Sequence, residues 1–97
     1  MPTLFLLSHA PHADPGEAKK IDLAKPGDAV VLMEDAVYAA GSAPTPFSPA
    51  IEDGRNREVS FYVLAADLAA RGVPSDLPQV DYDGLVDLIA AHERIVH

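Results

Sequence analysis

Apolar residues along this chain gather into short runs that are separated by stretches of mixed polarity. Three runs are almost wholly apolar, and runs of this length without charge are typical of strands buried on both faces of a sheet. We therefore predict strands at Thr3–Leu7, Ala29–Met33 and Val59–Leu64. Two shorter segments, Gln79–Asp81 and Ile95–Val96, are predicted as a fourth strand and as a last strand at a sheet edge.

Helix signals lie between these strands. Asp14 and Glu17 have the spacing of a capping box, which predicts a helix over about Pro15–Ala24. Ala65–Arg71 is predicted as a helix that ends at Gly72, because glycine is the usual residue just past a helix end.

The last helix has the clearest periodicity. Asp81 or Asp83 is predicted as its cap, and it runs to about Glu93. Apolar residues recur along it at spacings of three and four, which predicts one apolar face. That face is formed by Tyr82, Leu85, Val86, Ile89 and Ala90.

Two segments give weaker signals. Ala36–Ala40 is predicted as one or two helical turns. Gly41–Arg57, rich in glycine, serine and proline, is predicted as a long irregular loop or a loop with one short turn of helix. Loops of this length inside compact domains are usually functional or mobile.

Strand and helix signals thus alternate along the chain, which favours a single α/β domain over residues 1–97. We expect a three-layer sandwich around a mainly parallel sheet of about four to five strands. The hydrophobic core of so short a chain is small, so an additional interface would add stability.

Charge and composition narrow the possible functions. The net charge is −8 and the pI is near 4.6, which disfavours direct nucleic-acid binding because that binding needs Lys and Arg to neutralise phosphates. The nearest approach to a basic patch, Arg55 and Arg57, is interpreted as part of a solvated loop. No apolar run reaches the roughly 20 residues of a membrane span. Met1–Leu7 lacks a basic flank and a cleavage site, so we expect a cytoplasmic protein.

The segment just after the first strand contains the first candidate site. His9, His12 and Asp14 lie within six residues of one another, and imidazole with carboxylate suits zinc, nickel or iron. The segment offers no evident fourth ligand. The favoured interpretation is therefore an exposed loop with a helix cap and no metal, and these three residues remain candidates only.

Acidic residues form further candidates. Glu34 and Asp35 follow the second strand and could perform acid/base chemistry beside the histidines, although a helix cap at Asp35 is the favoured alternative. Asp67 and Arg71, four apart on a helix, predict a local ion pair, and Asp81 and Asp83 are interpreted as structural. The dispersed glycines form no phosphate-binding loop, so no nucleotide cofactor is expected. The residues considered for either an interface or the core are Phe47, Ile51, Tyr62, Tyr82 and Ile95.

Three segments taken together resemble the DsrH/TusB family: Val30–Ala40, Tyr62–Gly72 and Val80–Leu88. The resemblance implies a DsrE-like α/β sandwich and a place in a three-component sulfur-relay complex. The implied partners are DsrE/TusD-like and DsrF/TusC-like proteins, the first of which carries the main acceptor cysteine. The implied pathway is either 2-thiolation of tRNA wobble uridine or dissimilatory sulfur oxidation.

The cysteine count separates this chain from a sulfur carrier. Some relatives carry a cysteine in the first helix, whereas Lys20 stands near that place here and the whole sequence contains no cysteine. Persulfide transfer requires a thiolate, so we predict a non-catalytic structural subunit with no catalytic residue and no cofactor. The alternative is a stand-alone homo-oligomeric binding or regulatory module, with Gly41–Arg57 and the His9 segment as its site. An independent enzyme that uses His9 with Glu34 or Asp35 is the third hypothesis.

Overall fold

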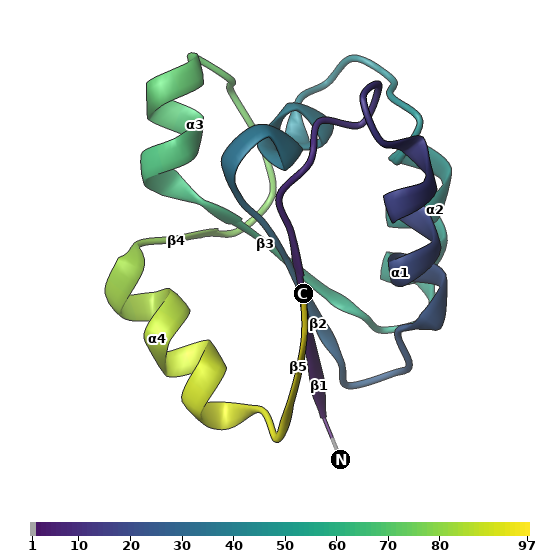
Figure 1. Ribbon diagram of the computed structural model, residues 1–97, viewed down its shortest axis with the longest axis vertical. Helices are drawn as coiled ribbons and strands as arrows, with labels where there is room; N and C mark the ends of the chain where they lie inside the picture. Colours follow the sequence, from purple (N-terminus) through teal and green to yellow (C-terminus); the bar gives the residue numbers. More distant parts are fainter. Residues whose placement is uncertain (1) are drawn as a thin grey trace.

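A computed structural model describes residues 2–97 as a five-stranded sheet with helices on both faces (Figure 1). All adjacent strands run parallel, in the order β4-β3-β2-β1-β5. This confirms the predicted α/β sandwich. The strands are β1 (Thr3–Leu7), β2 (Ala29–Leu32), β3 (Ser60–Leu64), β4 (Gln79–Val80) and β5 (Arg94–Val96).

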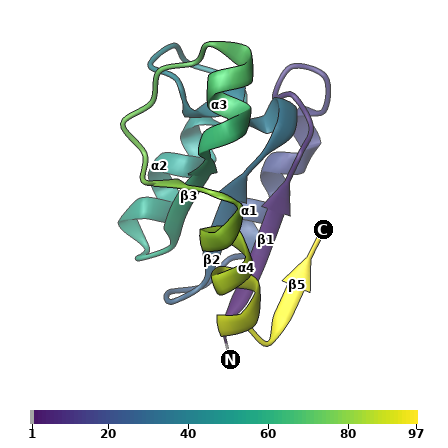
Figure 2. The same ribbon diagram turned by 90° about the vertical axis from the view of Figure 1, so that its left-hand side faces the viewer.

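The helical segments connect consecutive strands. The loop after β1 enters a short 3-10 helix that continues into α1, and a second 3-10 helix follows β2 directly. They are η1 (Pro15–Glu17), α1 (Ala18–Leu23), η2 (Glu34–Ala40), α2 (Ser48–Asn56), α3 (Ala65–Arg71) and α4 (Tyr82–Ala91). Because β4 and β5 form opposite edges of the sheet, the connection through α4 crosses its whole width (Figure 2).

Successive side chains of the central strands point to opposite faces of the sheet, because the side-chain period of a strand is two residues. On one face, the larger cluster joins strand residues such as Phe5 and Phe61 to Ile21 of α1 and Ile51 of α2. On the other face lies a smaller apolar cluster. Among the described residues, 2–97, its one buried helical member is Leu85 of α4. The sheet is therefore covered unevenly.

The region expected to be a long loop instead contains α2, a nine-residue helix. Gly54 allows it to pack closely, since a Cβ there would lie 2.8 Å from the Phe61 ring. Arg57, at the end of this helix, pairs with Asp53 at 2.8 Å and donates to the Ala24 carbonyl oxygen. The expected irregular loop and the solvated position of Arg57 are both wrong, because contacts with distant segments outweigh the weak local helix signals.

Two predicted caps are also corrected. Asp14 makes no side-chain hydrogen bond to the helix that follows it, so the expected capping box does not form. The short helix after β2 begins at Glu34 rather than Ala36, and Asp35 lies inside its first turn instead of capping it. In contrast, Asp81 caps α4, because its Oδ1 accepts from the Gly84 amide at 2.7 Å.

The apolar stripe of α4 is only partly buried. Leu85 lies in the core, whereas Tyr82, Val86 and Ile89 are exposed by 60%, 62% and 40%. We call these three exposed residues the α4 face. The predicted apolar face is therefore divided between the core and the surface. Of the other candidate interface residues, Phe47 and Ile51 are buried in the core, Tyr62 is half-buried and Ile95 is exposed.

Candidate functional site

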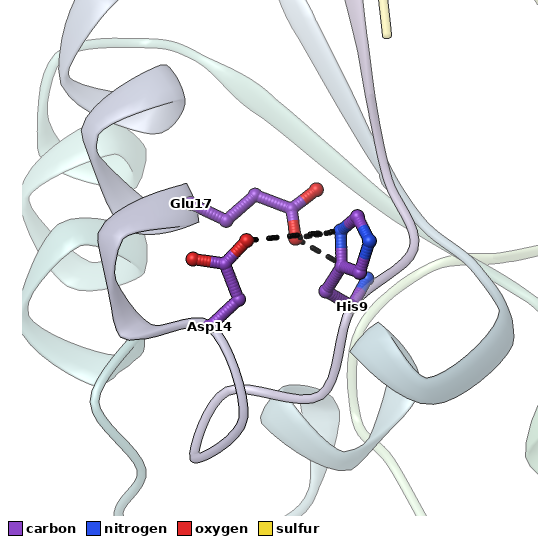
Figure 3. Close-up of side chains that lie close together, drawn as sticks. All are labelled: His9, Asp14 and Glu17. Carbon is purple, nitrogen blue, oxygen red and sulfur yellow. Dashed lines mark hydrogen bonds and ion pairs between the residues drawn. The ribbon is translucent and has the colours of Figure 1, made fainter.

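The loop after β1 is organised around a buried carboxylate. The Glu17 side chain is 2% exposed and extends from the start of the helix toward His9 (Figure 3). Its Oε1 accepts from the backbone N–H of Ser8 at 3.3 Å, and its Oε2 accepts from the backbone N–H of His9 at 3.2 Å. The Glu17 carboxylate thus accepts hydrogen bonds from backbone N–H groups of the loop instead of capping the helix.

The same carboxylate fixes the His9 ring. His9 Nδ1 lies 2.9 Å from Glu17 Oε2, and Asp14 Oδ2 lies 3.9 Å from the same nitrogen (Figure 3). Lys20 Nζ, on the next turn of helix, lies 3.7 Å from Glu17 Oε1. One imidazole and one ammonium therefore face two carboxylates at the start of α1.

The structure brings together two of the three metal candidates. His9 and Asp14 converge with Glu17, and one ligand atom from each lies within 4.8 Å of the others. His12 is exposed and does not belong to this group. Sequence reasoning missed Glu17 as a site residue. Its spacing from Asp14 was visible, but the cap interpretation directed its carboxylate to the helix rather than to the loop.

The acidic residues Glu34 and Asp35, at the start of η2, contact residues of α3. The Glu34 backbone, at a left-handed φ of 50°, donates its N–H to Asp67 Oδ2 at 2.6 Å. Arg71 Nε lies 2.8 Å from Asp35 Oδ1, and Arg71 also pairs with Asp67 at 3.6 Å, as the spacing predicted. The hydrogen bond to Asp35 raises the pKa of Arg71 above its usual range. Glu34 and Asp35 therefore contact α3, which supports a structural rather than an acid/base role.

A surface groove has a lining that shares no residue with either group. Residues of η2, α2 and the segment after α3 line it, among them Gly41, Arg55 and Leu77. The Gly41–Arg57 segment thus contributes to a surface hollow as well as to the core.

Comparison with known families identifies the chain. A family model described as "DsrH like protein" matches residues 9–95. The chain belongs to the DsrH-like family. Among solved structures, the solution NMR structure of protein Tm0979 from Thermotoga maritima is similar, with 26% sequence identity, a TM-score of 0.68 and 94% of each chain covered. A search of the curated proteins found no match.

Membership of the DsrH-like family confirms the resemblance drawn from the three segments and supports a general role as a sulfur-relay subunit. Lys20, which stands near the position where the resemblance predicts a cysteine in some relatives, contacts Glu17 and so lies beside this group. Within residues 2–97, no helix has the length and apolar character that crossing a membrane would require.

Proposed function

We propose that this chain is a non-catalytic structural subunit of a sulfur-relay complex, assembled in the cytoplasm with DsrE/TusD-like and DsrF/TusC-like proteins. The observation that carries the proposal is membership of the DsrH-like family in a chain without cysteine. A subunit that cannot hold a persulfide contributes to a relay by shaping the assembly around subunits that can.

The α4 face supports association with another protein. Its three side chains are exposed on α4, which among the described helices is the one whose buried residue packs on this face of the sheet. Burying exposed apolar surface against a partner is favourable by roughly 25 cal/mol per Å². Exposed acidic residues flank it at Asp81, Asp83 and Asp87. A partner that presents an apolar patch with a basic rim would match both features, whereas a second copy would bring like charges together.

Co-expression with one DsrE/TusD-like and one DsrF/TusC-like protein tests the proposal. Native mass spectrometry of the purified material is expected to show a hetero-oligomer that contains all three chains. Val86→Asp is expected to abolish the assembly, because it places a charge in the centre of the α4 face. Leu23→Asp is the matched control, since Leu23 is 67% exposed on α1 and lies on the other side of the sheet.

Assemblies built only from copies of this chain would overturn the proposal and favour the homo-oligomeric binding or regulatory module. For the pathway, we propose two versions, which two measurements after deletion of the chain would separate. Loss of 2-thiouridine from tRNA after deletion of the chain would support the tRNA branch. Unchanged 2-thiouridine with impaired sulfur oxidation would support the dissimilatory branch.

A further inference from the structure

The His9 ring is held in one tautomer. A carboxylate can only accept a hydrogen bond, so the 2.9 Å contact between Nδ1 and Glu17 Oε2 places the ring proton on Nδ1. Nε2 then keeps its lone pair, and the structure of residues 2–97 records no hydrogen bond at that atom. Because the His9 side chain is 63% exposed, this lone pair is accessible to another molecule.

The position of His9 in the fold is one where α/β sheets bind ligands. The chain leaves β1 in one direction through β2, β3 and β4 and returns to the other side of β1 as β5. Open parallel sheets place ligands outside the carboxyl ends of the strands, at such a reversal of strand order. His9 follows the carboxyl end of β1 by two residues, so it lies at this reversal.

Two carboxylates face the His9 ring. Glu17 and Asp14 are the carboxylates that face the ring, and the cation nearest to them, Lys20, contacts the other oxygen of Glu17. A positive charge that appears on the imidazole would be balanced by a buried carboxylate already in contact with it. In this arrangement a carboxylate orients a histidine that can act as a base.

We propose that His9, positioned by Glu17, accepts the proton of a thiol that a partner protein brings to this edge of the sheet. The proposal rests on the proposed place of the chain in a relay complex, and it adds a proton-accepting role for His9 to the structural role proposed above. The chain itself would still carry no sulfur. The partner's S–H bond breaks, its electron pair stays on sulfur, and an N–H bond forms at Nε2. The thiolate then attacks the terminal sulfur of a donor persulfide. One S–S bond forms as the donor's S–S bond breaks, and the displaced donor thiolate takes the proton back from Nε2.

The size of the effect follows from thiol ionisation. A cysteine with an ordinary pKa of about 8.5 is only about 3% thiolate at pH 7, so complete activation raises its reactivity by at most roughly 30-fold. The gain disappears above about pH 9, where the thiol ionises without help. A purely structural role for His9 would not produce this pH dependence.

The assembled complex is the material for the test. The probe is iodoacetamide, and the readout is the alkylation rate of the partner's cysteine between pH 6 and 9.5. His9→Gln is expected to lower that rate by about 10- to 30-fold at pH 7 and to leave it unchanged at pH 9.5. His12→Gln is the matched control, because His12 lies exposed in the same loop outside the cluster and its replacement should leave the whole profile unchanged.

The outcomes separate this inference from the proposed function. A complex that forms normally but keeps its alkylation profile with His9→Gln would overturn the role of His9 alone. Failure of any complex to form would overturn the proposed function and this inference with it. In the free chain, ¹⁵N NMR is expected to find the proton of the neutral His9 ring on Nδ1, and Glu17→Gln is expected to release that preference. A ring proton on Nε2 in the unmodified chain would also overturn the inference.

Discussion

Replacing Gly54 by alanine tests the packing of α2 on the sheet. In an exposed helix interior, glycine to alanine stabilises a protein by roughly 1 kcal/mol. At position 54, however, the added Cβ would lie 2.8 Å from Phe61 Cζ and 2.9 Å from Phe61 Cε2. Ile21 Cγ2, at 3.5 Å, lies on the same side. Because Phe61 is only 4% exposed, the ring has little room to move away.

The two effects oppose each other, and the clash should dominate. Overpacking in a core costs about 1–3 kcal/mol, and contact distances below 3.0 Å to a buried ring place Gly54→Ala at the upper end of that range. After the helix propensity gain of roughly 1 kcal/mol is subtracted, we expect a net destabilisation of about 1–2 kcal/mol. For a chain of this length, that corresponds to a lowering of Tm by about 4–16 °C.

Urea unfolding followed by circular dichroism measures this change. Glu52→Ala, at an exposed position of the same helix, is the control and should stay within about 0.5 kcal/mol of the parent. In a Phe61→Leu background, Gly54→Ala should cost clearly less, because the smaller side chain removes the contact. A stabilisation by Gly54→Ala in the parent chain would refute the close packing of α2 on β3.

Two further substitutions test local contacts. Asp81→Ala removes the acceptor for the Gly84 N–H at 2.7 Å and should cost about 1 kcal/mol in urea unfolding, whereas Asp83→Ala should cost much less; equal costs would contradict the capping role. Asp67→Ala removes the acceptor of the Glu34 N–H, so hydrogen exchange at that amide should become faster, and an unchanged rate would contradict the link between η2 and α3.

The structure brings together only some of the candidate site residues, and particular residues show why. His9 and Asp14 were chosen because their chemistry is evident in the sequence, and the structure does bring them together. Glu17 was missed because its spacing from Asp14 is typical of a local cap, whereas its carboxylate contacts the backbone of Ser8 and His9. Acid/base chemistry of Glu34 and Asp35 beside the histidines was the less favoured alternative. In the structure, the Glu34 N–H donates to Asp67 and Asp35 pairs with Arg71, so both contact α3.

The sequence by itself determined the three central strands, because buried parallel strands carry their apolar character in consecutive residues. It also indicated the alternation with helices, the two edge strands and the membership of a family. The 97-residue sequence also contains no cysteine, the residue on which a persulfide forms. Only the tertiary structure decided that α2 is a helix, that Glu17 lies beneath His9 and that the α4 face is exposed. Each of these depends on contacts between residues distant in the chain or on how a face is covered, and local spacing does not specify either.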